Sequence, residues 1–347
     1  MRGRMRVLSI LGARPQFIKH ASLQKRFDEF GIEEVLLHTG QHFDHDMSEV
    51  FFSSLALKTP DIQLECKSSH SLIQLGEMLR GMQERVGGEE FDWVIVYGDT
   101  TSTLAGSLFA KENALKLAHI EAGVRSFDLS MPEERNRILC DQLSDKLFAP
   151  NKNACENLCK EGVRGEIILS GDVMEEGFEL FAPLAQKPKE VNAEEFILCT
   201  LHRQSNVDDP KRLNFLLEGL GKIPLQILLP LHPRTKKRLE EFALTLPSNI
   251  LPIPPQGYLQ TLWLLRHAQM VITDSGGLQK EAVYAQKPCL ILREVSEWNE
   301  FVECRASFLL GEMEINEAFN KTLKNFQSLT FNLKEKPTLK IIEELLR

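Results

Sequence analysis

Several carboxylates stand where a chain usually turns out of a strand or into a helix. Asp99 comes directly after a short apolar run that ends in Gly98. Glu121 ends another apolar run, two positions before Gly123. Glu133 and Glu134 follow Pro132 at the expected start of a helix. Carboxylates crowded at one edge push their pKa values apart, which suits general acid and base chemistry. Helix capping is the alternative for Asp99, and interaction with a helix dipole is the alternative for Glu133 and Glu134.

The loop after the first apolar run carries cations beside an expected helix start. Gly12 permits a tight turn, and Pro15 suits the first turn of a helix. Arg14 and Lys19 then stand near a helix N-terminus, which favours anions. The segment therefore predicts an anion site, with a solvated turn as the alternative.

The second half of the chain carries residues suited to phosphate. His202 and His232 each follow an apolar run, with Arg203 directly after the first and Arg234 two positions after the second. A single histidine at a strand end is weak support, but two with nearby arginines favour phosphate contact.

A Ser-Gly-Gly turn, Ser275-Gly276-Gly277, precedes a helical stretch. Such a turn forms a backbone nest for a diphosphate. Its spacing is not that of a dinucleotide fingerprint. Glu281, one helical turn later, is placed to accept hydrogen bonds from ribose hydroxyls; the alternative is an exposed helix acid.

Short, nearly continuous apolar runs recur with amphipathic stretches such as 102–112 and 278–285 between them. Runs without alternation suit strands buried on both faces of a parallel sheet. The expected strands are 6–11, 35–39, 93–98, 117–121, 147–150 and 167–170 in the first half, and 196–201, 226–231, 250–253, 270–273, 289–293 and 308–311 in the second. This βαβ rhythm occurs twice and predicts an α/β protein of two Rossmann-like, doubly wound domains facing a central cleft.

The expected domains are 1–174 for catalysis and 175–330 for binding a nucleoside diphosphate, with a helical tail over 331–347. A length of 347 residues fits two domains. The net charge of −8 argues against a nucleic-acid partner. No apolar run approaches a membrane span, and the seven cysteines lack zinc spacing. We therefore expect no metal, no membrane insertion and a reducing, cytoplasmic location.

Eight blocks resemble the non-hydrolysing UDP-N-acetylglucosamine 2-epimerase family, in the family's order. They are GARPQFIK, HTGQH, GDTTSTLAG, HIEAGVRS, MPEERNR, LHRQSN, LHPR and DSGGLQKEA. The resemblance implies a glycosyltransferase-B-like fold and inversion at C2 of a UDP-2-acetamido sugar without a redox cofactor. In the family mechanism UDP is eliminated to leave a 2-acetamidoglucal, and UDP then adds back.

The resemblance also implies roles for individual residues. The catalytic candidates are Asp99, Glu121, Glu133, His202 and Lys19, and which carboxylate deprotonates C2 stays open. The substrate-binding candidates are Arg14, Gln41, His42, Glu134, Arg137, His232, Arg234, Ser275, Gly276, Gly277 and Glu281. The implied partners are the UDP-sugar and the UDP intermediate, and we expect a homodimer.

One segment departs from the usual family pattern. Members acting on UDP-N-acetylglucosamine typically carry Thr-Glu-Arg-Pro-Glu where this chain has Ser296-Glu297-Trp298-Asn299-Glu300. The chain thus resembles the subgroup that epimerises UDP-2,3-diacetamido-2,3-dideoxy-glucuronic acid, and Trp298 removes a cation from the usual sugar site. The segment after His42 differs from the form linked to allosteric activation by substrate. Synthesis of a cell-envelope polysaccharide such as O-antigen is implied.

The same fold also serves other functions. A hydrolysing epimerase would release free sugar, and a glycosyltransferase would need an acceptor site. A catalytically inactive UDP-sugar sensor is the non-enzyme alternative, but it would be expected to lack the acids found here.

Overall fold

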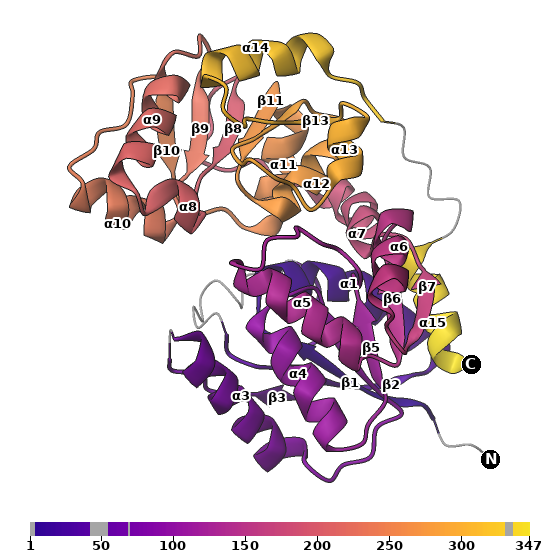
Figure 1. The fold of residues 1–347 in the computed structure, drawn as a ribbon. Helices are drawn as coiled ribbons and strands as arrows, with labels where there is room; N and C mark the ends of the chain where they lie inside the picture. The colour runs from indigo at the N-terminus through magenta and orange to yellow at the C-terminus, as the bar shows by residue number, and fades with distance from the viewer. Residues whose placement is uncertain (1–3, 42–54, 69, 330–335) are drawn as a thin grey trace. The chain divides into compact units, whose positions relative to one another are not determined.

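The computed structural model describes residues 4–41, 55–68, 70–329 and 336–347. The chain divides into two compact units, residues 1–180 with 333–347 as unit 1 and residues 181–332 as unit 2 (Figure 1). Each unit is a parallel sheet with helices packed against it.

Unit 1 holds a parallel sheet in the order β3-β2-β1-β4-β5-β6-β7. Its strands are β1 (Arg6–Leu11), β2 (Glu33–His38), β3 (Ile62–Gln63), β4 (Trp93–Tyr97), β5 (Leu117–Ile120), β6 (Lys146–Ala149) and β7 (Glu166–Leu169). Its helices are α1 (Arg14–Phe30), α3 (Ser71–Val86), α4 (Thr101–Glu112), α5 (Pro132–Leu143), α6 (Lys152–Glu161), α7 (Val173–Phe181) and α15 (Pro337–Leu346).

Unit 2 repeats this topology in the order β10-β9-β8-β11-β12-β13. Its strands are β8 (Ile197–Thr200), β9 (Ile227–Pro230), β10 (Ile250–Ile253), β11 (Met270–Thr273), β12 (Cys289–Ile291) and β13 (Ser307–Leu309). Its helices are η1 (Ala182–Leu184), α8 (Gln204–Val207), α9 (Pro210–Gly221), α10 (Pro233–Glu241), α11 (Tyr258–His267), α12 (Gly276–Tyr284), α13 (Asn299–Glu303) and α14 (Ile315–Asn325).

The predicted fold class is confirmed, since each apolar run expected to be a strand forms one and the strands pair in parallel. The two-residue strand β3 is the addition, and it pairs with β2 at the edge of the sheet. Its segment has no apolar run long enough to predict a strand. The central strands follow the expectation most closely: the whole of β4 is buried, as a strand covered on both faces should be.

In both units the strand order reverses direction between two neighbouring central strands. The reversal lies between β1 and β4 in unit 1 and between β8 and β11 in unit 2. Chain connections leave such a point in opposite directions, so the carboxyl ends of these strands open a crevice that holds ligands in doubly wound folds. The described candidate residues of the two units lie on the loops that follow these strands and their neighbours, or on the helices into which those loops lead.

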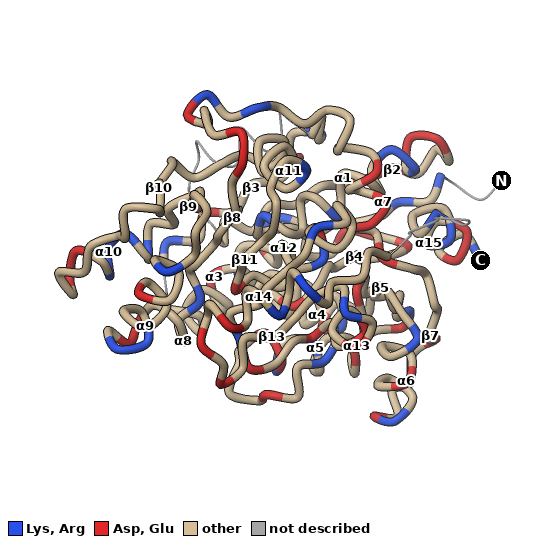
Figure 2. The backbone as a smooth tube through the Cα atoms, turned by 90° about the horizontal axis from the view of Figure 1, so that it is seen from above, with Lys and Arg blue, Asp and Glu red and all other residues tan. Residues whose placement is uncertain are grey.

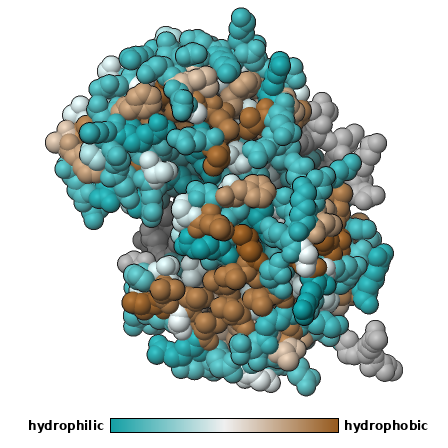
Figure 3. Space-filling view, in the orientation of Figure 1, coloured by the Kyte–Doolittle hydropathy of each residue, from teal (hydrophilic) through white to brown (hydrophobic). Residues whose placement is uncertain are grey.

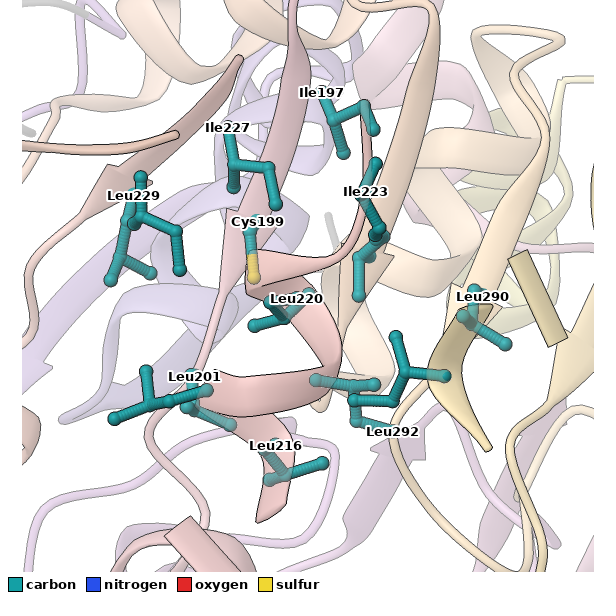
Figure 4. Packing of buried hydrophobic residues seen from close by; sticks show 14 of the residues in the cluster. Ile197, Cys199, Leu201, Leu216, Leu220, Ile223, Ile227, Leu229, Leu290 and Leu292 are labelled. Atoms are coloured by element: carbon teal, nitrogen blue, oxygen red, sulfur yellow. The ribbon is translucent and has the colours of Figure 1, made fainter. Parts of the chain in front are cut away.

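A buried aliphatic cluster holds the sheet of unit 2 against its helices. Ile197 and Cys199 of β8 pack with Leu220 of α9 and with Leu290 of β12 (Figure 4). Full burial of each such side chain contributes about 1.5–3 kcal/mol. Acidic and basic residues are interspersed along the chain (Figure 2), and much of the visible surface is hydrophilic (Figure 3).

The last helix, α15, belongs to unit 1, where it packs beside α1. The Trp93 indole N–H donates to the carbonyl of Leu345 at 3.1 Å. The Glu176 carboxylate accepts from the backbone N–H and the hydroxyl of Thr338 at 2.9 and 2.8 Å. These contacts fix the end of the chain to β4 and α7.

Candidate functional site

The loop after β1 is fastened to the end of β4 by the buried side chain of Gln16. Its Oε1 accepts from the N–H groups of Gly12 and Ala13 at 2.8 and 3.0 Å. Its Nε2 donates to the carbonyl of Tyr97 at 2.9 Å. A Cβ on Gly12 would lie 2.0 Å from Oγ1 of Thr39, so only glycine fits there. Gln16 therefore fixes the spacing of the two strand ends that flank the reversal in unit 1.

Lys19 and Glu121 form an ion pair that is almost removed from water. Their Nζ and Oε1 atoms lie 2.7 Å apart, and their side chains are 6% and 11% exposed. Glu121 has a φ of +69°, which is unfavourable for a residue with a side chain. Gly98 also has a positive φ, and a Cβ there would lie 3.2 Å from the Lys19 Nζ. Strained backbone of this kind gathers at functional sites.

The Asp99 carboxylate pairs with the guanidinium of Arg137 from α5. The Asn136 side chain also donates to the Asp99 carbonyl, at 2.9 Å. Helix α4 is capped instead by Thr100, whose hydroxyl accepts from the N–H of Thr103 at 3.3 Å. The capping alternative for Asp99 is therefore wrong, and its carboxylate is directed to a cation.

The two acids at the start of α5 have different surroundings. Glu134 is buried, and its carboxylate accepts from the N–H groups of Ser126 and Phe127 at 2.9 and 2.8 Å. Arg137 donates to the same carboxylate at 2.9 Å. Glu133 is half-buried. Glu134 thus holds the loop before α5, and direct substrate contact by either acid stays a prediction.

The remaining candidates of unit 1 line the loops after β1 and β2. Arg14 begins α1 and is half-buried. The Oε1 of Gln41 accepts from the N–H and the hydroxyl of Ser102 at 2.9 and 2.6 Å, which ties its loop to α4. His42 lies outside the described residues.

In unit 2 a buried carboxylate orients the first histidine candidate. The Oδ1 of Asp274 lies 3.0 Å from Nδ1 of His202. The Oδ2 accepts from the backbone N–H groups of His202 and Arg203, both at 2.8 Å. Burial alone would raise the pKa of Asp274, but the hydrogen bonds and charge of His202 outweigh it and the pKa lies below its usual value. An ionised Asp274 therefore sets the direction of the imidazole, whose side chain is 34% exposed.

His232 stacks on His202, with ring centroids 5.3 Å apart. It caps α10 by accepting from the N–H of Arg234 at 3.1 Å, so its Nδ1 carries no proton. Arg234 is bound by Asp208, with Nη2 and Oδ2 2.6 Å apart. The two histidines lie together because β8 and β9 are neighbours in the sheet, whereas the contact of either histidine or of Arg234 with a ligand stays a prediction.

The Ser-Gly-Gly turn begins α12. The Ser275 hydroxyl caps the helix by accepting from the N–H of Leu278 at 3.4 Å, and Gly276 and Gly277 form its first positions. The first N–H groups of a helix have no acceptor within it and lie at its positive end. This arrangement suits a diphosphate.

Glu281 follows on the same helix and is buried, so the alternative of an exposed helix acid is wrong. Burial, together with the neighbouring Glu281 carboxylate, raises the pKa of Tyr258 well above its usual value. The phenol therefore stays protonated beside this acid.

The segment that departs from the usual family pattern lies against this turn. Trp298 is buried, and the Lys280 Nζ lies 4.0 Å from the centroid of its ring. Arg293 binds Glu297 through both terminal nitrogens, at 2.8 and 2.9 Å. A Cβ on Gly276 would lie 3.5 Å from Oε2 of Glu297. Trp298 thus stands where an arginine was expected, but the ammonium of Lys280 lies on its face.

The parts of the chain that the structure describes hold neither a cluster of metal-ligating side chains nor a membrane-spanning helix. Over those ranges, no group of three or more His, Cys, Asp or Glu side chains is placed to hold a metal ion. Within the same ranges, none of the helices combines the length and the apolar character needed to cross a membrane.

Sequence reasoning missed the residues that hold the candidates in place. Gln16 and Asp274 do not contact a solvent-facing site themselves, and their position in the sequence gives little indication of a partner more than 70 residues away. The available signal was weak: each is a polar residue within a block that otherwise carries candidate residues.

Known proteins resemble this chain over most of its length. The family model described as UDP-N-acetylglucosamine 2-epimerase matches residues 25–337. A Pseudomonas aeruginosa UDP-2,3-diacetamido-2,3-dideoxy-D-glucuronate 2-epimerase is 45% identical, with 88% of each chain covered. A Methanocaldococcus jannaschii UDP-N-acetylglucosamine 2-epimerase is 39% identical, with 89% of each chain covered.

Solved structures give the same result. The Methanocaldococcus jannaschii UDP-GlcNAc 2-epimerase in complex with UDP-GlcNAc and UDP matches with a TM-score of 0.91 and 36% identity, over 99% of each chain. The Neisseria meningitidis enzyme bound to UDP-GlcNAc matches with a TM-score of 0.85 and 26% identity, over 99% of this chain and 100% of the other. The sequence blocks, the two parallel sheets and these matches agree, and the chain belongs to the UDP-N-acetylglucosamine 2-epimerase family.

Proposed function

We propose that this protein inverts C2 of a UDP-2-acetamido sugar by eliminating UDP and adding it back. The observation that carries the proposal is the pair of carboxylates after β4 and β5, each held by a cation: Asp99 with Arg137 and Glu121 with Lys19. Epimerisation requires a proton to leave one face of C2 and to return to the other. Two anionic groups on neighbouring strand ends can serve those two faces.

In the elimination, a carboxylate takes the C2 proton while the C1–O bond breaks. The electrons of the C2–H bond form the C1–C2 double bond, and those of the C1–O bond leave with UDP. Protonation at the opposite face and re-addition of UDP complete the inversion, so no electrons are exchanged with a cofactor. Asp99, Glu121 and Glu133 are the candidates for these transfers, and Lys19 holds the Glu121 carboxylate at 2.7 Å.

The residues of unit 2 are suited to the departing diphosphate. The N-terminus of α12 and the imidazole of His202 provide hydrogen-bond donors where negative charge develops. Asp274, whose Oδ1 lies 3.0 Å from Nδ1 of His202, orients the imidazole so that it can donate to the leaving oxygen. We assign UDP binding to the turn at Ser275, with Glu281 toward ribose.

We further propose UDP-2,3-diacetamido-2,3-dideoxy-glucuronate as the substrate. Its support is Trp298 in place of the usual arginine, together with the 45% identity to the Pseudomonas aeruginosa enzyme named for that sugar. A homodimer working in the cytoplasm, in synthesis of a cell-envelope polysaccharide, is part of the same proposal.

The decisive experiment incubates the protein with this uronate or with UDP-N-acetylglucosamine in deuterated water. We expect deuterium at C2 of the uronate and of its epimer, with UDP and glycal present only in traces. Deuterium in UDP-N-acetylglucosamine alone would reassign the substrate. Free sugar released at the rate of turnover would indicate hydrolysis, and an absence of exchange in both would refute the proposed function.

A further inference from the structure

His119 belongs to a group of buried polar side chains that contacts the loops of the proposed acids Asp99 and Glu121. It belongs to β5, is fully buried and precedes Glu121 by two residues. Its Nδ1 lies 2.7 Å from Oδ1 of Asp141, and its Nε2 lies 2.7 Å from the carbonyl oxygen of Gly98. Gly98 directly precedes Asp99. The imidazole therefore bridges a helix carboxylate and the loop that carries a proposed catalytic acid.

Both ring nitrogens of His119 face acceptors, which determines where its protons lie. A carbonyl oxygen can only accept, so Nε2 must donate. Asp141 already accepts from the N–H of Gly123 at 3.0 Å and from Nη2 of Arg125 at 2.7 Å. Burial acts to raise the pKa of Asp141, but the charges and hydrogen bonds of His119 and Arg125 outweigh it, and the pKa lies below its usual value. Asp141 is thus ionised, and Nδ1 donates as well.

The same carboxylate also holds the second catalytic loop. Gly123 and Arg125 follow Glu121 on the loop after β5, and Oδ2 of Asp141 accepts from both. Arg125 in turn binds Glu161 of α6, at 2.8 Å from Nε and 2.7 Å from Nη2. Donors and carboxylates therefore alternate from His119 to Glu161, and this pairing offsets the cost of burying His119, Asp141 and Arg125; Glu161 itself is exposed.

We infer that His119, protonated at both ring nitrogens, and Asp141 are positioning residues that set the spacing between the loops of Asp99 and Glu121. The inference rests on the proposed function, because it concerns the two acids assigned to proton transfer at C2. Neither residue touches the sugar in this assignment. Each fixes one loop through a backbone atom, His119 at the Gly98 carbonyl and Asp141 at the Gly123 N–H.

The first test observes the ring itself. In protein labelled with nitrogen-15 at histidine, both nitrogens of His119 should show directly bonded protons near neutral pH. The exposed His267 on α11 provides the comparison, and a His119→Asn variant identifies the resonances. A bare nitrogen in His119 would overturn the inference, and this result does not depend on turnover.

The second test compares two amides at this position. Asn can replace the donor to Asp141, whereas Gln can replace the donor to the Gly98 carbonyl. A displacement of about 1 Å at reacting groups costs about 100-fold in rate. We expect H119N to lower kcat about that much and H119Q to lower it less, with KM and UDP affinity nearly unchanged; H267N should leave all three unchanged.

The outcomes separate this inference from the proposed function. If the wild type turns over and H119N has the same kcat, only the positioning role is overturned. The same holds if H119N loses thermal stability but keeps its kcat. A wild type that exchanges deuterium into neither sugar would instead overturn the proposed function. If neither variant folds, the nitrogen-15 spectrum of the wild type decides, because a ring with one bare nitrogen cannot make both contacts.

Discussion

Replacing Asp274 with Asn exchanges one carboxylate oxygen for an NH₂ group. This change is expected to weaken His202 as a donor to the departing diphosphate. The Oδ2 of Asp274 accepts from two backbone N–H groups, those of His202 and Arg203. In the variant the amide oxygen must take these contacts, because the amide nitrogen cannot accept. The NH₂ group then faces Nδ1 of His202, which lies 3.0 Å from Oδ1 in the wild type. Nδ1 becomes the acceptor and carries no proton, so the ring holds a single proton, on Nε2, and cannot bear a positive charge.

The size of the effect follows from the lost charge-assisted hydrogen bond. Such bonds contribute about 1.5–3 kcal/mol. With about 1.4 kcal/mol for each factor of ten, kcat should fall about 10- to 100-fold. Folding should change little, because the amide oxygen still satisfies the buried donors.

Steady-state rates of C2 inversion, UDP affinity and denaturant unfolding measure these effects. Asp209→Asn is a matched control, since Asp209 caps α9 by accepting from Lys211 and Arg212 and Asn caps a helix equally well. Asp274→Ala should differ by unfolding more easily, at about 1–3 kcal/mol for each donor left without an acceptor. A D274N enzyme with kcat within twofold of the wild type would refute the reasoning about the tautomer.

Three further substitutions test other parts of the site. Lys19→Met should abolish turnover and lower the free energy of unfolding by about 3–5 kcal/mol, because Glu121 loses the ammonium of Lys19 from a nearly buried ion pair. Adding E121Q to this variant should restore stability but not activity. A K19M protein as stable as the wild type would contradict this. The depressed pKa of Asp141 stabilises the fold above the unfolded value of about 4 and loses that effect as pH falls through the lower folded value. The difference in unfolding free energy between wild type and D141N should therefore narrow in acid, and a constant difference would argue against it. Trp298→Arg should destabilise unit 2, because it replaces the ring under the Lys280 ammonium with a second cation. Thermal unfolding measures this effect, and an unchanged melting temperature would refute it.

The fold could be predicted well because its signal is local. Buried parallel strands need continuous apolar runs, and such runs are visible in the sequence at every strand except β3. β3 has only two residues and is held by pairing with β2, which no local pattern reveals. The regular alternation of strand and helix then fixed the fold class.

The candidate site was only partly predictable. Strand-end positions placed Asp99, Glu121 and His202 after β4, β5 and β8, where the structure has them, but the partners of their side chains depend on distant segments. Asp99 illustrates this: its position before a helix favours capping, yet the adjacent Thr100 caps α4 and Arg137 takes the carboxylate. The burial of Glu281 likewise depends on its tertiary surroundings rather than on its own helix.

Both units fasten the crevice at the strand reversal with one buried polar side chain, but its charge differs. In unit 1 the neutral amide of Gln16 accepts from two N–H groups after β1 and donates to the end of β4. In unit 2 the Asp274 carboxylate, after β11, accepts from two N–H groups after β8. An amide suffices where backbone must only be joined. A carboxylate adds negative charge, and it occurs where an imidazole must also be oriented. The same topology thus fastens the proposed acid and base groups in one unit and the proposed donors to the diphosphate in the other.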